Sequence, residues 1–447
     1  MMYDLAIIGG GPGGYVAAER AGAAGLKVIL FEKNELGGVC LNEGCIPTKA
    51  LLCCAKTYDH ALHGKTFGVS ADAVSFDFSK MMERKTRVVR RLVGGVKAKM
   101  KAASVEVVKG SANIEGRTSD GFEIACDGQS FTASHLLICT GSSAAVPPIP
   151  GLAESGAIVT NREILALDEL PESLVIIGGG VIGMEFASFF NSLGTKVTVI
   201  EMLPKILGNL DGEISAMLQA IYAKKGITFK LGCKVTGIDG NEVIYETAEG
   251  ETERAAGTKI LVSVGRRANI KGFGLENIGV IAERGIKVDD HMRTNVPGVY
   301  AAGDVTGFSL LAHTASREAE VAIANILGGD ERMSYCAIPG VVYTSPEVAG
   351  VGLTEEQAEG CGVLKLPMAY SGRYVAENED ISGLCKIIYD KASGKVTGLH
   401  MLGTPCSEII QSGCIAIESG MTVGQLKKIV FPHPTVSEII KETLQGV

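Results

Sequence analysis

The amino-acid sequence predicts an α/β protein, and three observations lead to that fold class. The chain has 447 residues, enough for about two to four domains with sizeable cores. A pattern of strand, glycine-rich turn, helix and strand occurs twice, and short apolar runs bounded by glycine follow. After about Ser334 the pattern changes to strand-like alternation with turn signals, which indicates an antiparallel sheet with helices beside it.

The first copy of the repeated pattern lies near the N-terminus. An apolar strand-like run at residues 5–8 leads into the turn Gly9–Gly14, and a helix pattern rich in small residues continues to Ala24. A second strand-like run at residues 27–31 ends in Glu32. This order is typical of a βαβ unit.

The second copy has the same layout far downstream. Residues 174–177 form the first run, Gly178–Gly183 the turn, and residues 197–200 the second run, which ends in Glu201. The last glycine and the acid are separated by the same interval in both copies. The sequence therefore predicts two Rossmann-like βαβ units.

Each glycine-rich turn has the features of a dinucleotide site. A turn that opens a helix presents backbone N–H groups and the positive end of the helix dipole to a pyrophosphate. A side chain on the middle glycine would strike that ligand, and the acid accepts hydrogen bonds from a ribose diol. The alternative is a turn that only allows close helix packing, and the complete strand, helix and acid in each copy argue against it. The glycine positions are Gly9, Gly11, Gly14, Gly178, Gly180 and Gly183.

Glu201 indicates which nicotinamide dinucleotide the second site binds. A carboxylate at this position repels a 2′-phosphate, and the next three residues, 202–204, offer no cation to bind one. We therefore expect NAD rather than NADP.

Further elements complete the predicted fold. Short apolar runs that are typical of buried parallel strands lie at 136–139, 260–264 and 299–302. The C-terminal part contains strand-like runs at 341–343, 385–389 and 396–401 and helix-like stretches at 407–419 and 436–444. A basic stretch from Arg84 to Lys101 is interpreted as the solvated face of a helix.

Two of the 12 cysteines lie close together just after the first βαβ unit. Cys40 and Cys45 come near the start of a predicted helix, where the pKa of a thiol is lowered. Beside a flavin, such a pair can relay two electrons to or from an outside dithiol. Inert buried thiols and a zinc site remain alternatives, although no second closely spaced Cys/His pair completes a zinc site. The other cysteines are expected to be packing residues: Cys53, Cys54, Cys126, Cys139, Cys233, Cys336, Cys361, Cys385, Cys406 and Cys414.

Composition argues against several classes of protein. The net charge of −8 makes nucleic acid an unsuitable partner. No apolar run of membrane-spanning length and no secretory signal pattern occur, so we expect no membrane association. Many cysteines without a secretory signal indicate a reducing compartment, and we expect a cytoplasmic protein without a metal site.

With these motifs in place, the chain resembles the flavin-dependent pyridine nucleotide–disulfide oxidoreductases over essentially its whole length. The block Gly37–Lys49 resembles the redox-active segment of that family, and His433–Glu438 its last motif. The motifs between them match in order: Thr140-Gly141, Gly265-Arg266 and Ala302-Gly303-Asp304-Val305. A smaller set of residues resembles the branch that oxidises dihydrolipoamide: Leu41, Ile46-Pro47, Ala312-His313 and Glu201.

The resemblance implies a domain order and two cofactors, FAD and NAD. An FAD-binding domain is expected at 1–146, an NAD-binding domain at 147–268, a central segment completing the FAD domain at 269–335, and an α+β dimerisation domain at 336–447. The implied FAD contacts are Gly9, Gly11, Gly14, Glu32, Lys49, Ala112, Thr140, Gly141, Asp304 and Ala312. The implied NAD contacts are Gly178, Gly180, Gly183 and Glu201, and Gly265 borders a cofactor.

The resemblance also assigns catalytic roles. Cys45 is expected to face the flavin, where its thiolate forms a charge-transfer complex, and Cys40 to exchange with the substrate. Lys49 is expected to pair with Glu185 near the flavin and nicotinamide. His433 is expected to take the proton of the substrate thiol, since the ordinary pKa of histidine is about 6.5, with its carboxylate partner Glu438 fixing the tautomer.

The family likeness implies an active homodimer, in which this histidine reaches the disulfide of the other subunit. The expected substrate is dihydrolipoamide on a lipoyl-bearing acyltransferase or a glycine-cleavage carrier protein. Rival interpretations are a glutathione reductase-like enzyme for another small disulfide, a non-catalytic FAD-binding subunit, and a metallothiol protein. Val39 and Glu43 stand where the family often has Thr and Val, and both flank the cysteine pair.

Overall fold

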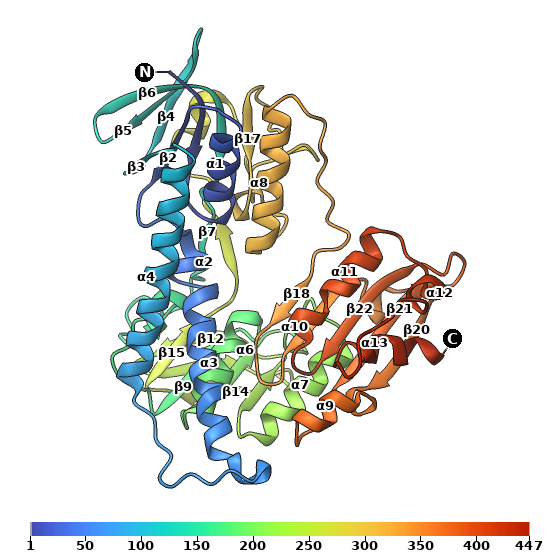
Figure 1. Ribbon diagram of the computed structural model, residues 1–447. Helices are drawn as coiled ribbons and strands as arrows, with labels where there is room; N and C mark the ends of the chain where they lie inside the picture. Colours follow the sequence, from blue (N-terminus) through green and yellow to red (C-terminus); the bar gives the residue numbers. More distant parts are fainter. Residues whose placement is uncertain (1, 447) are drawn as a thin grey trace. The chain divides into compact units, whose positions relative to one another are not determined.

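The computed structural model describes residues 2–446 (Figure 1). Within that range the chain divides into two compact units. The first contains the residues up to Ala50, Met82–Ala145 and Gly265–Ser334, and the second contains Leu51–Met81, Val146–Val264 and the residues from Tyr335. Two long helices, α3 (Cys45–Leu62) and α4 (Phe78–Ala102), each contribute to both units.

The first unit is built on a seven-stranded sheet in the order β3-β2-β1-β6-β5-β4, with β17 also paired to β6. The central strands β2, β1 and β6 are parallel, in the register Ile7↔Leu30 and Ile7↔Leu137. The strands are β1 (Met2–Ile8), β2 (Val28–Glu32), β3 (Glu106–Lys109), β4 (Asn113–Thr118), β5 (Gly121–Cys126), β6 (Gln129–Ile138) and β17 (Val299–Ala301), and β7 (Ser142–Ala144) pairs with β16 (Arg266–Ala268) outside this sheet.

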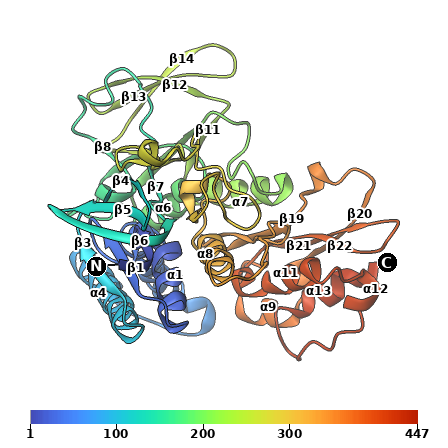
Figure 2. The ribbon, with the colours of Figure 1, turned by 90° about the horizontal axis from the view of Figure 1, so that it is seen from above.

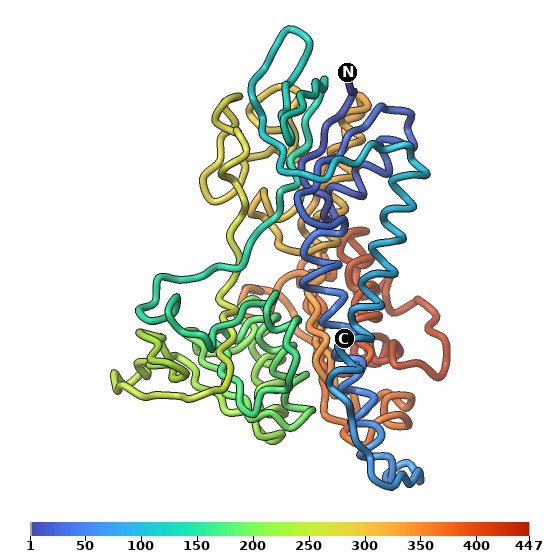
Figure 3. Tube along the Cα trace, turned by 90° about the vertical axis from the view of Figure 1, so that its left-hand side faces the viewer, coloured from blue at the N-terminus to red at the C-terminus, as the bar shows by residue number. Residues whose placement is uncertain are grey.

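Segments far apart in sequence meet in this unit. Strand β17 pairs with the C-terminal half of β6, and helix α8 (Ala312–Ile326) packs on α1 (Pro12–Ala23), where Arg20 forms an ion pair with Glu320. Figure 3 shows the blue N-terminal trace beside the orange trace of this later segment. Residues 269–334 therefore supply a strand and a helix to the sheet that the N-terminus begins.

The second unit contains a parallel five-stranded sheet in the order β11-β10-β9-β15-β8. Its strands are β8 (Ile158–Val159), β9 (Ser173–Ile177), β10 (Lys196–Glu201), β11 (Thr228–Leu231) and β15 (Lys259–Val262). A smaller antiparallel sheet follows, made of β12 (Lys234–Asp239), β13 (Glu242–Glu246) and β14 (Thr252–Ala256). The helices here are α5 (Asn161–Ile164), α6 (Val181–Ser192) and α7 (Gly212–Lys224).

The C-terminal part of the second unit is an antiparallel sheet in the order β18-β19-β22-β21-β20. Figure 2 shows its helices along one face of the sheet. The strands are β18 (Gly340–Val342), β19 (Val348–Gly352), β20 (Cys361–Pro367), β21 (Leu384–Asp390) and β22 (Val396–Leu402). The helices are α9 (Gly372–Glu377), α10 (Cys406–Ile409), α11 (Gln411–Glu418), α12 (Val423–Leu426) and α13 (Glu438–Thr443).

The predicted fold class is confirmed, and most elements occur where the sequence pattern indicates them. Each βαβ helix ends two residues before a glycine with positive φ, Gly25 at +89° and Gly194 at +91°, a conformation that side chains disfavour. Some details differ. The run at 136–139 is the end of the longer β6, and the helix expected over 407–419 is divided into α10 and α11 at Ile410.

The predicted division into four domains stays a prediction. Residues 51–81 group with the second unit, although the predicted FAD domain includes them. Residues 265–268 group with the first unit because β16 pairs with β7 there. Within residues 2–446, no helix combines the length and apolar character needed to cross a membrane.

Candidate active site

In both glycine-rich turns, the first and last glycines of the motif are required by the backbone conformation and by packing within the protein. Gly9 has φ +107° and Gly178 has φ +106°, in the region that favours glycine. A Cβ on Gly14 would lie 1.8 Å from the carbonyl oxygen of Gly9, and a Cβ on Gly183 would lie 2.2 Å from that of Gly178. Close approach of helix and turn therefore excludes any side chain at these positions.

The middle glycines differ, because the protein leaves space beside them. A Cβ on Gly180 would meet no protein atom within 4 Å, and one on Gly11 would come no closer than 3.8 Å, to Gly38. Each is the N-cap of its helix, α6 or α1, and no side chain caps either helix end. An open helix N-terminus beside a bare backbone fits a pyrophosphate, so both turns fit a dinucleotide.

The two acids, Glu32 and Glu201, have matching hydrogen bonds. Glu32 accepts the backbone N–H of Gly10 at 2.8 Å, and its other oxygen accepts that of Asn34 at 2.7 Å. Glu201 accepts the N–H of Gly179 at 2.6 Å and that of Leu203 at 2.8 Å. Each carboxylate is thus fixed against its glycine turn, a structural role that the sequence pattern did not reveal.

A pocket of about 400 Å³ opens beside Glu32, in the size range of sites for small ligands. Lys97 and Lys109 contact Glu35 at its rim, at 3.0 and 3.3 Å, and these hydrogen bonds lower the pKa of Glu35. Helix α4, interpreted from the sequence as a solvated face, therefore also forms a wall of this pocket. The lining residues are Glu32, Asn34, Glu35, Leu36, Lys97, Met100, Lys101, Val105, Val107 and Lys109.

Asp304 belongs to a partly buried polar cluster that the sequence did not reveal. Its carboxylate accepts a hydrogen bond from the Ser142 hydroxyl and lies 3.8 Å from Arg266 Nε. The Arg266 guanidinium also donates to the hydroxyl and the carbonyl oxygen of Ser142, both at 2.7 Å. Burial lowers the pKa of Arg266, against the attraction of Asp304. This network fixes the carboxylate that is expected to bind the ribityl chain.

Several other predicted FAD contacts lie in backbone segments that are held by hydrogen bonds or burial. Asn269 donates its amide to the Thr140 carbonyl at 2.9 Å and accepts the Thr140 hydroxyl on its own carbonyl at 2.7 Å. Gly141 and Gly265 have φ +67° and +114°, with no protein atom within 4 Å of an added Cβ. Ala112 is buried before β4, and Ala312 is the first residue of α8. Together with the open turn and the pocket, these features fit FAD.

The side chains of Cys40 and Cys45 lie beside one another and are joined by a hydrogen bond. Cys40 lies in the short helix α2 (Gly38–Asn42), and Cys45 is the first residue of α3. A hydrogen bond with Cys45, together with burial, raises the pKa of the Cys40 thiol, and the nearby Lys49 opposes that shift. The lowered pKa that the nearby helix start predicts is therefore not found for Cys40.

Tyr15 of α1 is a neighbour of the thiol pair that the sequence did not reveal. Burial, followed by the charges on Cys40 and Cys45, raises the pKa of its hydroxyl. The sequence pattern gives no sign of this role, because Tyr15 directly follows the glycine-rich turn at an ordinary position of α1. Its phenol stays protonated at neutral pH and is available as a hydrogen-bond donor.

The packing role expected of the other cysteines holds for only some of them. Cys126, Cys139, Cys233, Cys385, Cys406 and Cys414 are buried, and Cys54 and Cys361 are partly buried. The expectation is wrong for Cys53 and Cys336, which are exposed. Cys53 lies on the solvent side of α3, and sequence alone does not show which face of a helix is covered. Within residues 2–446, no group of three or more His, Cys, Asp and Glu side chains is arranged to hold a metal ion.

His433 and Glu438 form the predicted pair. His433 Nδ1 lies 3.0 Å from Glu438 Oε1, and the other carboxylate oxygen accepts the backbone N–H of Thr435 at 2.8 Å. These two hydrogen bonds, the backbone one first, lower the pKa of Glu438. An ionised carboxylate on Nδ1 leaves Nε2 as the basic nitrogen, and the His433 side chain is 81% exposed, so this nitrogen can reach an outside thiol.

Lys49 and Glu185 lie in different units, and their pairing stays a prediction. Glu185 is only 3% exposed and accepts the backbone N–H of Tyr343 at 3.1 Å. That bond ties α6 to the segment after β18. Lys49 lies on α3, one turn after Cys45.

These features define a flavoprotein disulfide oxidoreductase: two glycine-rich turns that fit dinucleotides, a pair of neighbouring cysteines, and a histidine hydrogen-bonded to a carboxylate. Comparison with known families leads to the same class. Residues 3–319 match the pyridine nucleotide-disulphide oxidoreductase family, and residues 338–444 match the dimerisation domain of that family. The chain belongs to the pyridine nucleotide-disulphide oxidoreductase family.

Individual relatives narrow the comparison. A dihydrolipoyl dehydrogenase from Chlorobaculum tepidum is 41% identical over 98% of this chain and 96% of its own length. One from Geobacillus stearothermophilus is 40% identical over 99% and 95%. A solved structure, the Cu(II) complex of the HOCl-induced flavoprotein disulfide reductase RclA from Escherichia coli, is 28% identical with a TM-score of 0.89 and covers 100% of both chains. The protein is an oxidoreductase that uses FAD and NAD.

The open space at Gly180 gives a test of the second dinucleotide site. Gly180→Ala is expected to weaken NAD binding about tenfold or more, because a methyl group would occupy the pyrophosphate position. The melting temperature should change little, since the added Cβ meets no protein atom within 4 Å. Calorimetric titration with NAD⁺ measures the affinity. Gly156→Ala is the control, because Gly156 is exposed and equally uncrowded. Unchanged affinity in Gly180→Ala would place the dinucleotide elsewhere.

Proposed function

We propose that the enzyme is a dihydrolipoyl dehydrogenase, which oxidises dihydrolipoamide to lipoamide and reduces NAD⁺ to NADH. The observation that carries this proposal is the cysteine pair formed by Cys40 in α2 and Cys45 at the start of α3, in a chain about 40% identical to dihydrolipoyl dehydrogenases over almost its whole length. When bound, FAD would supply two-electron transfer between a dithiol and the nicotinamide.

In the working direction, Cys40 and Cys45 begin as a disulfide. A thiolate of dihydrolipoamide attacks Cys40 Sγ, which forms a mixed disulfide and releases Cys45 as a thiolate. The second substrate thiol then attacks the substrate sulfur of that mixed disulfide, which closes the lipoamide ring. Its proton passes to Cys40, which leaves as a thiol. Two electrons have then moved from substrate to the cysteine pair, and NAD⁺ is the final acceptor.

His433 is proposed to take the proton from the substrate thiol on Nε2. The carboxylate of Glu438, 3.0 Å from Nδ1, holds the required tautomer and stabilises the imidazolium that forms. Lys49 and Glu185 are proposed to pair near the reacting groups.

We propose that the active form is a homodimer. A match to a dimerisation domain over residues 338–444 supports this, as does a catalytic histidine that is 81% exposed. In a homodimer, His433 of one subunit serves the cysteine pair of the other. The proposed macromolecular substrate is a lipoyl-bearing acyltransferase or glycine-cleavage carrier protein in the cytoplasm.

A paired assay tests the choice of substrate. Dihydrolipoamide with NAD⁺ should be turned over rapidly, and glutathione disulfide with either NADH or NADPH should not. The second candidate function is reduction of another disulfide, which the likeness to RclA favours. Faster turnover of glutathione disulfide than of dihydrolipoamide would favour that second function.

The coenzyme preference is a further expected result. The enzyme should use NADH at least about tenfold more efficiently than NADPH, because the Glu201 carboxylate repels a 2′-phosphate. The first cation after Glu201, Lys205, is engaged elsewhere: its Nζ donates to the Leu210 carbonyl at 2.8 Å and lies 3.5 Å from Glu356. Measuring kcat/KM for both coenzymes decides the point, and comparable values would contradict it.

A further inference from the structure

The loop between β10 and α7, residues 202–210, packs directly on the second glycine-rich turn. The backbone N–H of Leu207 donates to the carbonyl oxygen of Gly179 at 2.9 Å, and Ile206 and Leu207 are 0% and 2% exposed. Gly179 also donates its own N–H to Glu201. The loop therefore supports both the turn and the acid of the proposed NAD site.

Leu207 has strained backbone. Its φ is +53°, a left-handed conformation that residues with a side chain adopt only when their surroundings enforce it. One side of this residue is held by Gly179. On the other side, the Leu210 N–H donates to the Leu207 carbonyl at 2.7 Å, so the conformation depends on where the loop ends, at Asp211.

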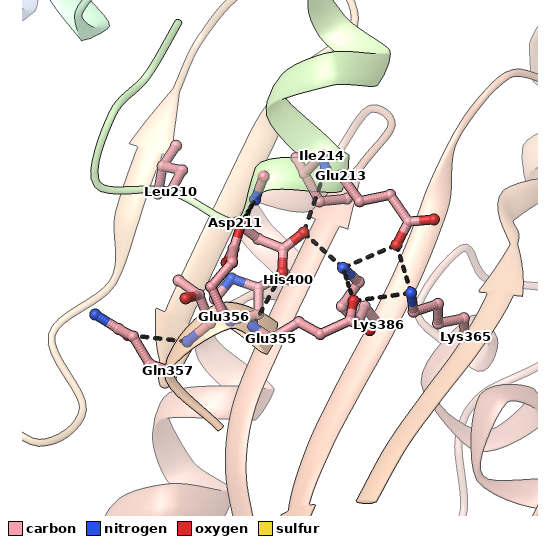
Figure 4. A network of polar contacts seen from close by, with 12 residues as sticks. Leu210, Asp211, Glu213, Ile214, Glu355, Glu356, Gln357, Lys365, Lys386 and His400 are labelled. Carbon is pink, nitrogen blue, oxygen red and sulfur yellow. Dashed lines mark hydrogen bonds and ion pairs between the residues drawn. The ribbon is translucent and has the colours of Figure 1, made fainter. Parts of the chain in front are cut away.

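Asp211 is anchored more firmly than a helix cap requires. Its side chain is 1% exposed, and Oδ1 caps α7 by accepting the Ile214 N–H at 3.3 Å. Oδ2 accepts the Glu355 N–H at 3.2 Å, and Lys386 Nζ lies 2.6 Å from Oδ1 (Figure 4). The end of the loop is thus fastened to the antiparallel sheet.

Lys386 is the centre of this attachment. It lies on β21, its side chain is 0% exposed, and its Nζ also contacts Glu355 at 2.7 Å and Glu213 at 2.9 Å. Lys365 contacts the same two glutamates at 2.8 Å each, as Figure 4 shows. Burial opposes the charge of Lys386, but the hydrogen bonds to Asp211, Glu355 and Glu213 outweigh burial and raise its pKa. Three carboxylates thus surround two ammonium groups, which leaves one net negative charge in the cluster.

Joining two elements through a fully buried lysine carries a free-energy cost for desolvating its charge, which apolar packing would avoid. A buried ion pair is directional, so it can fix one specific position of a segment. Here it fixes the strained loop 202–210 against the glycine-rich turn Gly178–Gly183.

We propose that Lys386 is a positioning residue for NAD: through Asp211 it holds the loop 202–210 in the strained form that supports the Gly178–Gly183 turn and Glu201. This inference rests on the proposed NAD site. It predicts that a residue of the antiparallel sheet, Lys386, raises the affinity for NAD without contacting NAD.

The test compares Lys386→Met with Lys365→Met in the full-length holoenzyme. Lys386→Met should weaken NAD⁺ binding about ten- to hundredfold by calorimetric titration, because the turn and Glu201 lose their support. Reduction of the flavin by dihydrolipoamide in an anaerobic single turnover should keep its rate, since that step does not need NAD. Lys365→Met removes an ammonium group from the same glutamates without touching Asp211, and its NAD⁺ affinity should stay within about twofold of the parent.

Unpaired Asp211 can unfold the single variant, so the double variant Lys386→Met/Asp211→Asn accompanies it. Asparagine still caps α7 and removes the buried charge, but it has no ammonium group to bind. The double variant should be folded and should show the same loss of NAD⁺ affinity. Unchanged NAD⁺ affinity in a folded Lys386 variant would overturn the role of Lys386. An equal loss of NAD⁺ affinity in the control Lys365→Met would overturn it as well. If Gly180→Ala also leaves the affinity unchanged, the proposed NAD site itself fails, so the two failures are distinguishable.

Discussion

Replacing Cys40 with serine should lower dihydrolipoamide turnover by at least about a thousandfold, the effect of removing an attacked or attacking group in covalent catalysis. Serine forms no disulfide, so the variant has no Cys40 sulfur for the substrate thiolate to attack. Cys45 alone cannot accept two electrons from a dithiol. Steady-state assay with dihydrolipoamide and NAD⁺ measures the loss.

The chain offers a matched control for this variant. Cys53→Ser makes the same chemical change at an exposed cysteine of α3, the helix that begins with Cys45, and it should keep full turnover because Cys53 lies outside the proposed site. Cys40→Ser should still retain FAD and should still oxidise NADH with an artificial dye as acceptor, because the dye takes electrons without a thiol. Full lipoamide turnover in Cys40→Ser would refute the assignment of the thiol pair.

The two dinucleotide units were predictable because their signals are local and steric. Gly14 and Gly183 admit no Cβ, since each would strike the carbonyl of a glycine five residues earlier. Such a requirement is visible in the sequence as glycine at fixed spacing between a strand and a helix. The acids Glu32 and Glu201 were predictable because each follows the last glycine of its turn at the same interval and ends the second strand.

What the sequence could not show depends on contacts between distant segments. Lys386 and Asp211 are 175 residues apart, and Ser142 and Asp304 are 162 apart. Nothing in the neighbourhood of either residue in the sequence indicates its partner. A buried lysine in particular resembles any lysine at a strand position until the sheet and its neighbours are assembled.

Helix faces show a similar limit. The stretch 84–101 is helical, as its pattern predicts, but its role depends on what lies beside it. Lys97 and Lys101 line the pocket next to Glu32 because β2 and β3 bring that acid to α4. For α3, the exposed position of Cys53 follows from which face the unit covers, which periodicity alone does not determine.

Replacing His433 with glutamine should lower turnover of dihydrolipoamide by about 10²- to 10⁴-fold at neutral pH, the usual contribution of a general base. Glutamine keeps a polar side chain of similar reach but cannot take the substrate proton. Oxidation of NADH with a dye acceptor should be unchanged, because that reaction involves no substrate thiol.

The pH profile separates loss of a base from loss of structure. An ordinary thiol has a pKa of about 8.5, so a rising pH supplies the substrate thiolate without a base. The deficit of His433→Gln should therefore shrink as the pH rises through that range, whereas a structural defect would persist at every pH. Glu438→Gln should show a smaller loss, since it keeps Nε2 but removes the carboxylate that holds Nδ1 at 3.0 Å. A deficit independent of pH would assign His433 a structural role only.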